Sequence, residues 1–300
     1  SLSPRFVPGQ VFRYAMEFET TTATSRSGIA HDAEGPSSLV VTWDATVRME
    51  VLPVADNLPG GIRLRTTYEK SGATIRSDTF DPTAAETQEQ YRKLEGKVVE
   101  FTLDSAGKVV SVSGIEGIAE GDKASQAARQ WIAQLDASSG APPGGVAIGQ
   151  KWSTEQPANS LPLAGMVWRS DTEYLRDEPC HPPNPDVPAS VAAADPTDPK
   201  GTDETCAVLL THLNLVRPKP VRDPTPEEYR KNGVTTAGKW EGSGQSLIYV
   251  SLRTGTVVSI TQTGLEEMDV TLTSTKKTSM HYEGTIESRS QVALVADDSP

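Results

Sequence analysis

Hydrophobic and polar residues alternate along most of this chain, which is the pattern of β-strands that bury one face. In the run from Leu39 to Leu52, Trp43, Val47 and Met49 fall on one side and Arg48 falls on the other with further polar residues. One dry and one wet face are typical of an antiparallel sheet. About twelve such runs predict strands. They are Val11 to Thr22, Leu39 to Leu52, Gly61 to Lys70, Ala73 to Phe80, Val98 to Leu103, Lys108 to Ser113, Met166 to Arg176, Ala207 to Val216, Gln245 to Leu252, Thr256 to Gln262, Met268 to Thr275 and Ser279 to Val295.

Helical patterns are few, so we expect a mostly β fold with two or three short helices. The spacing predicts one helix near residues 83–95 and a second near 123–136, where Trp131 belongs to an apolar stripe. A short third helix is expected from Pro226 to Gly233. All three are interpreted as lids or packing struts.

A weak internal repeat predicts two similar halves, each a curved antiparallel sheet or half-barrel. Gly9-Gln10 is echoed by Gly149-Gln150, and the alternating run at Trp43 by the run at Trp168. We expect the first half to span residues 1–140 and the second to span 141–300, with a long loop at 179–205 in the second. Chance similarity between short alternating strands is the alternative.

The composition excludes several classes of protein. The 300 residues are 36% hydrophobic and 6% aromatic, and no apolar run is long enough for a transmembrane helix. The net charge of -12 repels phosphate backbones and anionic lipid surfaces, so nucleic acid is not expected as a partner.

The two cysteines, Cys180 and Cys206, sit at the feet of a proline-rich loop that follows one predicted strand and precedes the next. A disulfide between them is the favoured interpretation, and it would stabilise the fold by roughly 3 to 4 kcal/mol. Two unpaired buried thiols, or a metal or redox pair, are the alternatives. A disulfide indicates an oxidising compartment, so the protein is expected to be periplasmic or extracellular. The start at Ser1 without a leader is interpreted as a signal peptide that has been removed.

This loop is predicted to be a contact element, because a long loop in a compact domain is uncommon unless it is functional or disordered. A tolerated surface insertion is the alternative. The acidic residues of the loop could accept calcium, but a solvated loop is preferred because the spacing of a calcium-binding loop is missing. The candidate contact residues are His181, Pro182, Pro183, Pro185 and Pro188.

The chain lacks the common motifs of metalloproteases, hydrolases, nucleotide-binding and dinucleotide-binding proteins. Its four histidines are scattered singly. We therefore expect no catalytic, cofactor-binding or metal-binding residues and no cofactor. Large aromatic residues either fill the sheet cores or line a pocket. These candidates are Phe12, Trp43, Trp131, Trp152 and Trp168.

Two hairpins turn at a glycine and share a D-x-x-G-x-V-x-x-V-like pattern, in residues 98–114 and 245–264. Together with the long strands and few helices, they resemble the open half-barrels of bacterial envelope lipid carriers, the LolA/LppX-like group, and secreted bacterial proteins with the same hairpin. The resemblance implies a concave sheet that holds an acyl chain and is closed by a helix such as 123–135. It assigns no functional residue.

Three functions remain open. The first is a non-catalytic cell-envelope protein that binds another envelope protein or assembles with itself, which accounts for the missing catalytic motifs. The second is a carrier or sensor of an apolar, lipid-like molecule held in a concave sheet. The third is an enzyme without a recognisable motif.

Overall fold

The computed structural model describes residues 2, 5–28, 31–53, 61–79, 83–104, 109–114, 142, 145–180 and 204–295. The elements in this part of the chain are β1 (Val11–Gly28), β2 (His31–Leu52), β3 (Ile62–Ser77), α1 (Ala84–Arg92), β4 (Val98–Leu103), β5 (Val109–Ser113), β6 (Lys151–Pro157), β7 (Val167–Pro179), β8 (Thr205–Val216), α3 (Glu227–Lys231), β9 (Val234–Ser251), β10 (Val257–Ser274) and β11 (Ser279–Val295).

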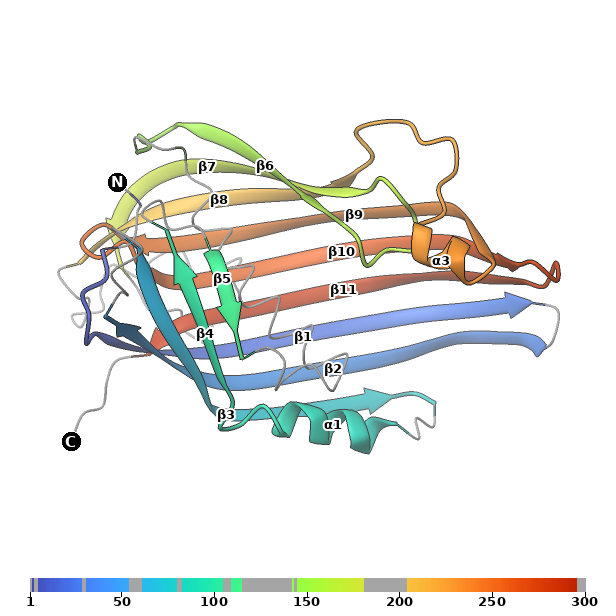
Figure 1. Cartoon of the computed structure of the whole chain (residues 1–300), viewed down its shortest axis with the longest axis horizontal. Helices are drawn as coiled ribbons and strands as arrows, with labels where there is room; N and C mark the ends of the chain where they lie inside the picture. Colours follow the sequence, from blue (N-terminus) through green and yellow to red (C-terminus); the bar gives the residue numbers. More distant parts are fainter. Residues whose placement is uncertain are drawn as a thin grey trace.

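The strands of the described residues form one antiparallel sheet of 11 strands, in the order β5-β4-β3-β2-β1-β11-β10-β9-β8-β7-β6 (Figure 1). The prediction of a mostly β fold with minor helix is therefore confirmed. The strands of the two predicted halves join in a single sheet, because β1 pairs with β11 along nearly its whole length. The sheet is open, with β5 and β6 at its two edges.

Several predicted boundaries were wrong, and the errors share one cause. Residues 61–70 and 73–80 were expected as two strands but form the single strand β3, and β10 likewise joins 256–262 with 268–275. β6 is absent from the twelve predicted runs, although the repeat implies a strand after Gly149-Gln150, and the first part of β9 was not predicted as a strand. The segments that join or extend these strands contain glycine or acidic residues, which lower strand propensity, but pairing with neighbouring strands holds them in the sheet.

The two helices in the described residues match predicted ones. α1 lies within the predicted range 83–95, and α3 lies between Pro226 and Gly233. α1 contacts β3 and contributes the buried side chain of Tyr91 to the core. The predicted helix at 123–136 lies outside the described residues.

The sheet curls at one end around its main hydrophobic core. That core contains Phe101 of β4 and Ile248 of β9, although six steps of strand pairing separate these two strands in the sheet. β4 and β5 accordingly lie in front of β9 and β10 in Figure 1. Tyr14 of β1 reaches across β11 and donates a hydrogen bond of 2.9 Å to the carbonyl of Val257. The inner face of the sheet is the face that carries these core residues.

Trp43 lies at the centre of this core and is only 1% exposed. Its ring contacts the rings of Phe18, Tyr68 and Tyr91, with centroids 5.2 to 6.3 Å apart. Its indole nitrogen donates to the hydroxyl of Ser71 at 2.9 Å, and that hydroxyl donates to the carbonyl of Tyr91 at 2.6 Å. This chain of hydrogen bonds satisfies the polar atoms of the aromatic core and joins β2, β3 and α1.

The outer face is polar, as the alternation predicts. Arg63 and Arg65 of β3 both bind Glu100 of β4, at 2.7 and 2.8 Å. Their hydrogen bonds and charges hold the pKa of the Glu100 carboxyl below its usual value, against a small opposing effect of burial. These groups lie partly in solvent, so each ion pair contributes little to stability.

The same turn opens β1 and β6. Gly9 and Gly149 both have positive φ, 91° and 82°, and each backbone N–H donates to a carbonyl of the returning strand, at 2.8 and 2.7 Å. The side chains of Gln10 and Gln150 each accept a hydrogen bond from the backbone N–H three residues earlier. The repeated sequence thus forms repeated local structure. The division at residue 140 stays a prediction, because that position lies outside the described residues.

The strands β1 and β11 approach each other closely at Gly284. A Cβ atom at this position would lie 2.9 Å from the Cα atom of Thr24 and still closer to the carbonyl oxygen of Ala23. Both neighbours are backbone of the paired strand β1, so they cannot move aside without breaking the pairing. Glycine is required here because strand backbones approach too closely for any side chain.

We predict that Gly284→Ala lowers the free energy of unfolding by about 1–3 kcal/mol, because the added methyl group forces β1 and β11 apart. Gly72→Ala is the matched control, since a Cβ atom at Gly72 meets nothing within 4 Å. Urea unfolding followed by circular dichroism measures both variants. Equal stability of Gly284→Ala and the parent protein would contradict this account of the contact between β1 and β11.

Candidate functional site

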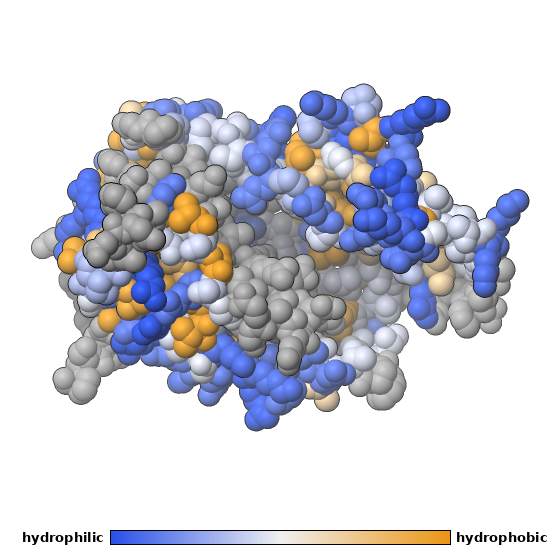
Figure 2. Space-filling model, viewed as in Figure 1, coloured by the Kyte–Doolittle hydropathy of each residue, from blue (hydrophilic) through white to orange (hydrophobic). Residues whose placement is uncertain are grey.

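A pocket lies on the inner face, across the strands β6 to β10. Its free volume is about 50 Å³, enough for a few water molecules. It is lined by Trp152, Thr154, Ser170, Thr172, Thr211, Leu213, Ser246, Ile248, Ile260 and Gln262. The space-filling view shows the molecule hollowed between the two long sides of the curved sheet (Figure 2). The pocket is therefore a local depression in the concave inner face of the sheet.

Small side chains keep this part of the inner face from filling. Thr172, Thr211, Ser246, Gln262 and Ser290 follow one another directly across five strands. In the next row, Gly244 pairs with Gly264. The hydroxyls of Thr172 and Thr211 share a hydrogen bond of 2.9 Å, so each hydroxyl has a hydrogen-bond partner within the wall of the pocket. The opposite end of the pocket is apolar, because Ile248 and Ile260 belong to the main core.

A second apolar cluster lies beyond this polar band. Its buried members are Ala158, Leu161, Leu163, Met166, Leu215 and Val270, with Trp168 and Trp240 packed against them. The hollow is thus bounded along the strands by the main core at one end and by this second cluster at the other. Figure 2 shows hydrophobic residues on the molecular surface to the left of the hollow and at its upper right, whereas the residues of the main core are buried beneath the surface.

Glu266 is an acidic residue on the inner face, beside the second cluster. It pairs with Gly242 of β9 and accepts a hydrogen bond of 2.8 Å from the indole nitrogen of Trp240. Burial raises the pKa of the Glu266 carboxyl above its usual value, and the hydrogen bond from Trp240 partly offsets this. The carboxylate is therefore held where its charge is incompletely solvated.

The structure divides the predicted aromatic residues between core and pocket. Phe12 is partly buried against the main core and meets Phe6 edge-to-face, with ring centroids 5.7 Å apart. Trp43 fills the core, whereas Trp152 lines the pocket. Trp168 packs in the second cluster. Trp131 lies outside the described residues.

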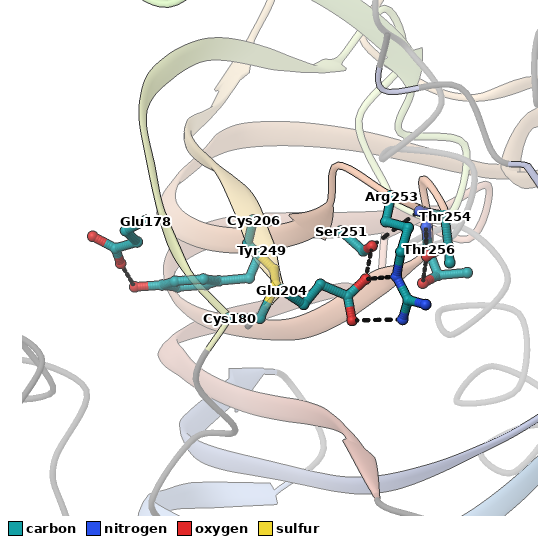
Figure 3. Close-up of a disulfide and its surroundings, with 9 residues drawn as sticks. All are labelled: Glu178, Cys180, Glu204, Cys206, Tyr249, Ser251, Arg253, Thr254 and Thr256. Atoms are coloured by element: carbon teal, nitrogen blue, oxygen red, sulfur yellow. Dashed lines mark hydrogen bonds and ion pairs between the residues drawn. A yellow bond between two sulfur atoms is a disulfide. The ribbon is translucent and has the colours of Figure 1, made fainter. Parts of the chain in front are cut away.

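The predicted disulfide between Cys180 and Cys206 is present, with a Cα–Cα distance of 5.0 Å. It joins the end of β7 to the start of β8 and is buried beside Val258 and Tyr249 (Figure 3). A backbone hydrogen bond of 2.8 Å from Cys180 to Glu204 continues the pairing next to it. The bridge therefore closes the hairpin at the feet of the proline-rich segment.

Polar contacts surround the disulfide and anchor the foot of the hairpin (Figure 3). Glu204 accepts hydrogen bonds from the hydroxyl of Ser251 and from the guanidinium of Arg253. Burial acts to raise the pKa of the Glu204 carboxyl, but these hydrogen bonds outweigh burial and lower it. Tyr249 donates a hydrogen bond to Glu178. The predicted contact residues His181, Pro182, Pro183, Pro185 and Pro188 lie outside the described residues, so their role stays a prediction.

Two kinds of feature are absent from the described residues. No group of three histidine, cysteine or acidic side chains there could hold a metal ion. No helix there is long and apolar enough to cross a membrane.

No protein-family model and no curated protein sequence matches the chain. Among solved structures, the fold is similar to that of a lipovitellin structure described as showing lipid–protein interactions. The TM-score is 0.50 and the sequence identity is 12%, and the match covers 98% of this chain and 26% of the lipovitellin chain. The chain thus spans about a quarter of that protein's length.

A second similar structure is an outer membrane channel from Pseudomonas putida F1. The identity is 7%, the match covers 97% of each chain, and the TM-score of 0.21 is too low to support an argument. These likenesses concern the fold alone. The finer resemblance to the LolA/LppX-like group stays a prediction.

Sequence reasoning missed Glu266 and Trp240, which form the polar end of the hollow. Both lie in segments that were not expected to be strands, so no face could be assigned to them. The pattern Trp240-x-Gly242-x-Gly244 was the available signal, because its three residues fall on one face of β9. Glycines that alternate with polar residues in this way indicate a strand that another group approaches closely.

We predict that Cys180→Ala/Cys206→Ala lowers the free energy of unfolding by about 3.5 kcal/mol, the chain-entropy value for a loop of this length. Urea unfolding of the double variant, compared with the oxidised and the reduced parent protein, measures the loss. Reduction should lower the stability of the parent and leave the double variant unchanged. Two free thiols in non-reducing peptide mapping of the purified protein would contradict the bridge.

Proposed function

We propose that this protein is a non-enzymatic binding protein that holds an apolar, lipid-like molecule on the inner face of its curved sheet. The observation that carries the proposal is the pocket between Trp152, Ile248 and Ile260, which opens into a hollow with apolar residues at both ends. Ligand sites of this kind are concave, largely apolar and provided with a few polar groups.

The dimensions favour an extended molecule. The pocket alone is small, at about 50 Å³, but the inner face continues along the strands from the pocket to the second apolar cluster. From Ile260 to Glu266 the rise along β10 is about 20 Å. An acyl chain lying along the strands would bury its length against the inner face. The fold likeness to lipovitellin, a protein described by its interactions with lipid, supports this choice over the other functions.

The disulfide supports an extracytoplasmic location, because such bonds persist in oxidising compartments. We therefore propose a periplasmic or extracellular carrier or sensor. No enzyme activity is part of this proposal.

Assembly with another copy of the chain is the second candidate function. Its support is the edge strand β5, where Val110 and Val112 are 51% and 36% exposed. An exposed edge strand can pair with a strand of a second molecule. Sedimentation of the purified protein tests this: a dimer that Val112→Lys dissociates supports assembly, and a monomer at all concentrations rules out self-assembly.

We predict that Gln262→Trp weakens the binding of a neutral fluorescent monoacylglycerol by about tenfold or more, because the indole occupies the pocket. Thr263→Trp is the matched control, since Thr263 is the next residue of β10 and is exposed on the outer face. Fluorescence titration measures the affinity, and circular dichroism confirms that both variants fold.

Two outcomes would contradict the carrier function. One is the absence of monoacylglycerol binding by the parent protein, together with the absence of co-purifying lipid in native mass spectrometry. The other is equal binding by the parent and a correctly folded Gln262→Trp variant, which would place the ligand elsewhere.

A further inference from the structure

Two indole rings and one carboxylate meet around Gly242 on the inner face. A Cβ atom at Gly242 would lie 2.6 Å from the Cη2 atom of Trp168 and 3.1 Å from the Cβ atom of Leu215. The ring of Trp168 therefore reaches from β7 across β8 and lies over the backbone of β9. The missing side chain at Gly242 makes room for it.

Glu266 lies directly opposite Gly242, on the neighbouring strand β10. Trp240, two residues before Gly242 on the same face of β9, donates its indole N–H to one oxygen of that carboxylate at 2.8 Å. The three side chains thus come from three different strands to one place. All three are only partly buried, so a small group can reach them from the hollow.

Glu266 is the only charged residue among the described inner-face positions of β8 to β11. The inner-face positions of β8 to β11 are otherwise filled by apolar residues, glycine, uncharged polar residues and tyrosine. No lysine or arginine of the described residues forms an ion pair with Glu266, and Trp240 occupies only one of its two carboxylate oxygens. Burial raises the pKa of this carboxyl, which is the cost of a charge without a cationic partner.

We infer that Trp168, Trp240 and Glu266 bind the ammonium group of an amphiphilic ligand whose hydrocarbon chain lies in the pocket. Indole faces attract cations, most of all quaternary ammonium groups, and a half-buried carboxylate adds a full opposite charge. A cation here also removes the cost of the unpaired carboxylate.

The position fits one amphiphile that lies along the strands. Gln262 lines the pocket, and Glu266 is four residues further along the same face of β10, a rise of about 13 Å. An alkyl chain in the pocket therefore places its polar end at Glu266. This inference rests on the proposed function, because it names the head group of the ligand that the pocket would hold.

The test compares two lipid probes that differ only in charge at the head. One is lysophosphatidylcholine, and the other is its carbon isostere, in which a tert-butyl group replaces the trimethylammonium group. Both are titrated below their critical micelle concentrations against the full chain. We expect the parent protein to bind the ammonium probe about tenfold more tightly than the isostere.

Glu266→Gln should reduce this preference to less than about threefold while the affinity for the isostere stays unchanged, because the amide keeps the size of the side chain and removes its charge. Glu267→Gln is the matched control. It makes the same change in net charge at the adjacent, exposed residue of β10, and it should keep the full preference.

Each other outcome overturns the inference. If the parent binds both probes equally, or if Glu266→Gln keeps the preference, the head-group site is wrong and the chain site of the proposed function stands. A preference that is lost equally in Glu267→Gln reflects the overall charge rather than this site. If neither probe binds, the head-group site is wrong, and the monoacylglycerol titration shows separately whether the proposed function stands.

Discussion

The close approach of neighbouring strand backbones on the inner face is the constraint on which the rest of the structure depends. A long sheet can curve only where the side chains on its concave face are small enough for the strands to bend inward. At Gly284 and Gly242 the space of a side chain is taken by the neighbouring backbone of β1 or by the ring of Trp168. Both glycines lie toward the second-cluster end of the strands, whereas β4 lies over β9 at the other end, where the main core closes around Phe101 and Ile248. The hollow exists because the same sheet continues beyond that core.

The polarity of the inner face changes along the strands, and this change explains why the hollow does not fill. Near the curled end, large apolar side chains meet and exclude water. In the middle, hydroxyls and glycines replace them, and residues such as Thr211 and Ser246 cannot reach across the space. Two indoles and further apolar residues then form the second cluster. A ligand with a hydrocarbon chain and a polar end matches this order.

The alternation at Trp43 was enough to predict β2, its two faces and the mostly β fold, because a period of two is a local property. The first part of β9 and the middle of β10 could not be predicted as strands. Gly242 and Glu266 there have low strand propensity, and pairing with residues distant in sequence holds them in the sheet. The disulfide could be inferred, because the chain has only two cysteines and both lie at the feet of one hairpin. The pocket could not, because whether Trp152 lines a space or fills one depends on how strongly the whole sheet curls.

Where a charge lies matters more for recognition than how many charges the chain carries. Most described ion pairs of the outer face lie partly in solvent, as Arg63 and Arg65 do with Glu100, and water and salt weaken their fields within about a Debye length. Glu266 is partly buried beside the indole of Trp240, opposite Gly242, over which the ring of Trp168 lies, and the effective dielectric constant is lower there than in water. A single carboxylate there can select the head group of a bound molecule, whereas the net charge of -12 acts only on the approach of charged partners from solution.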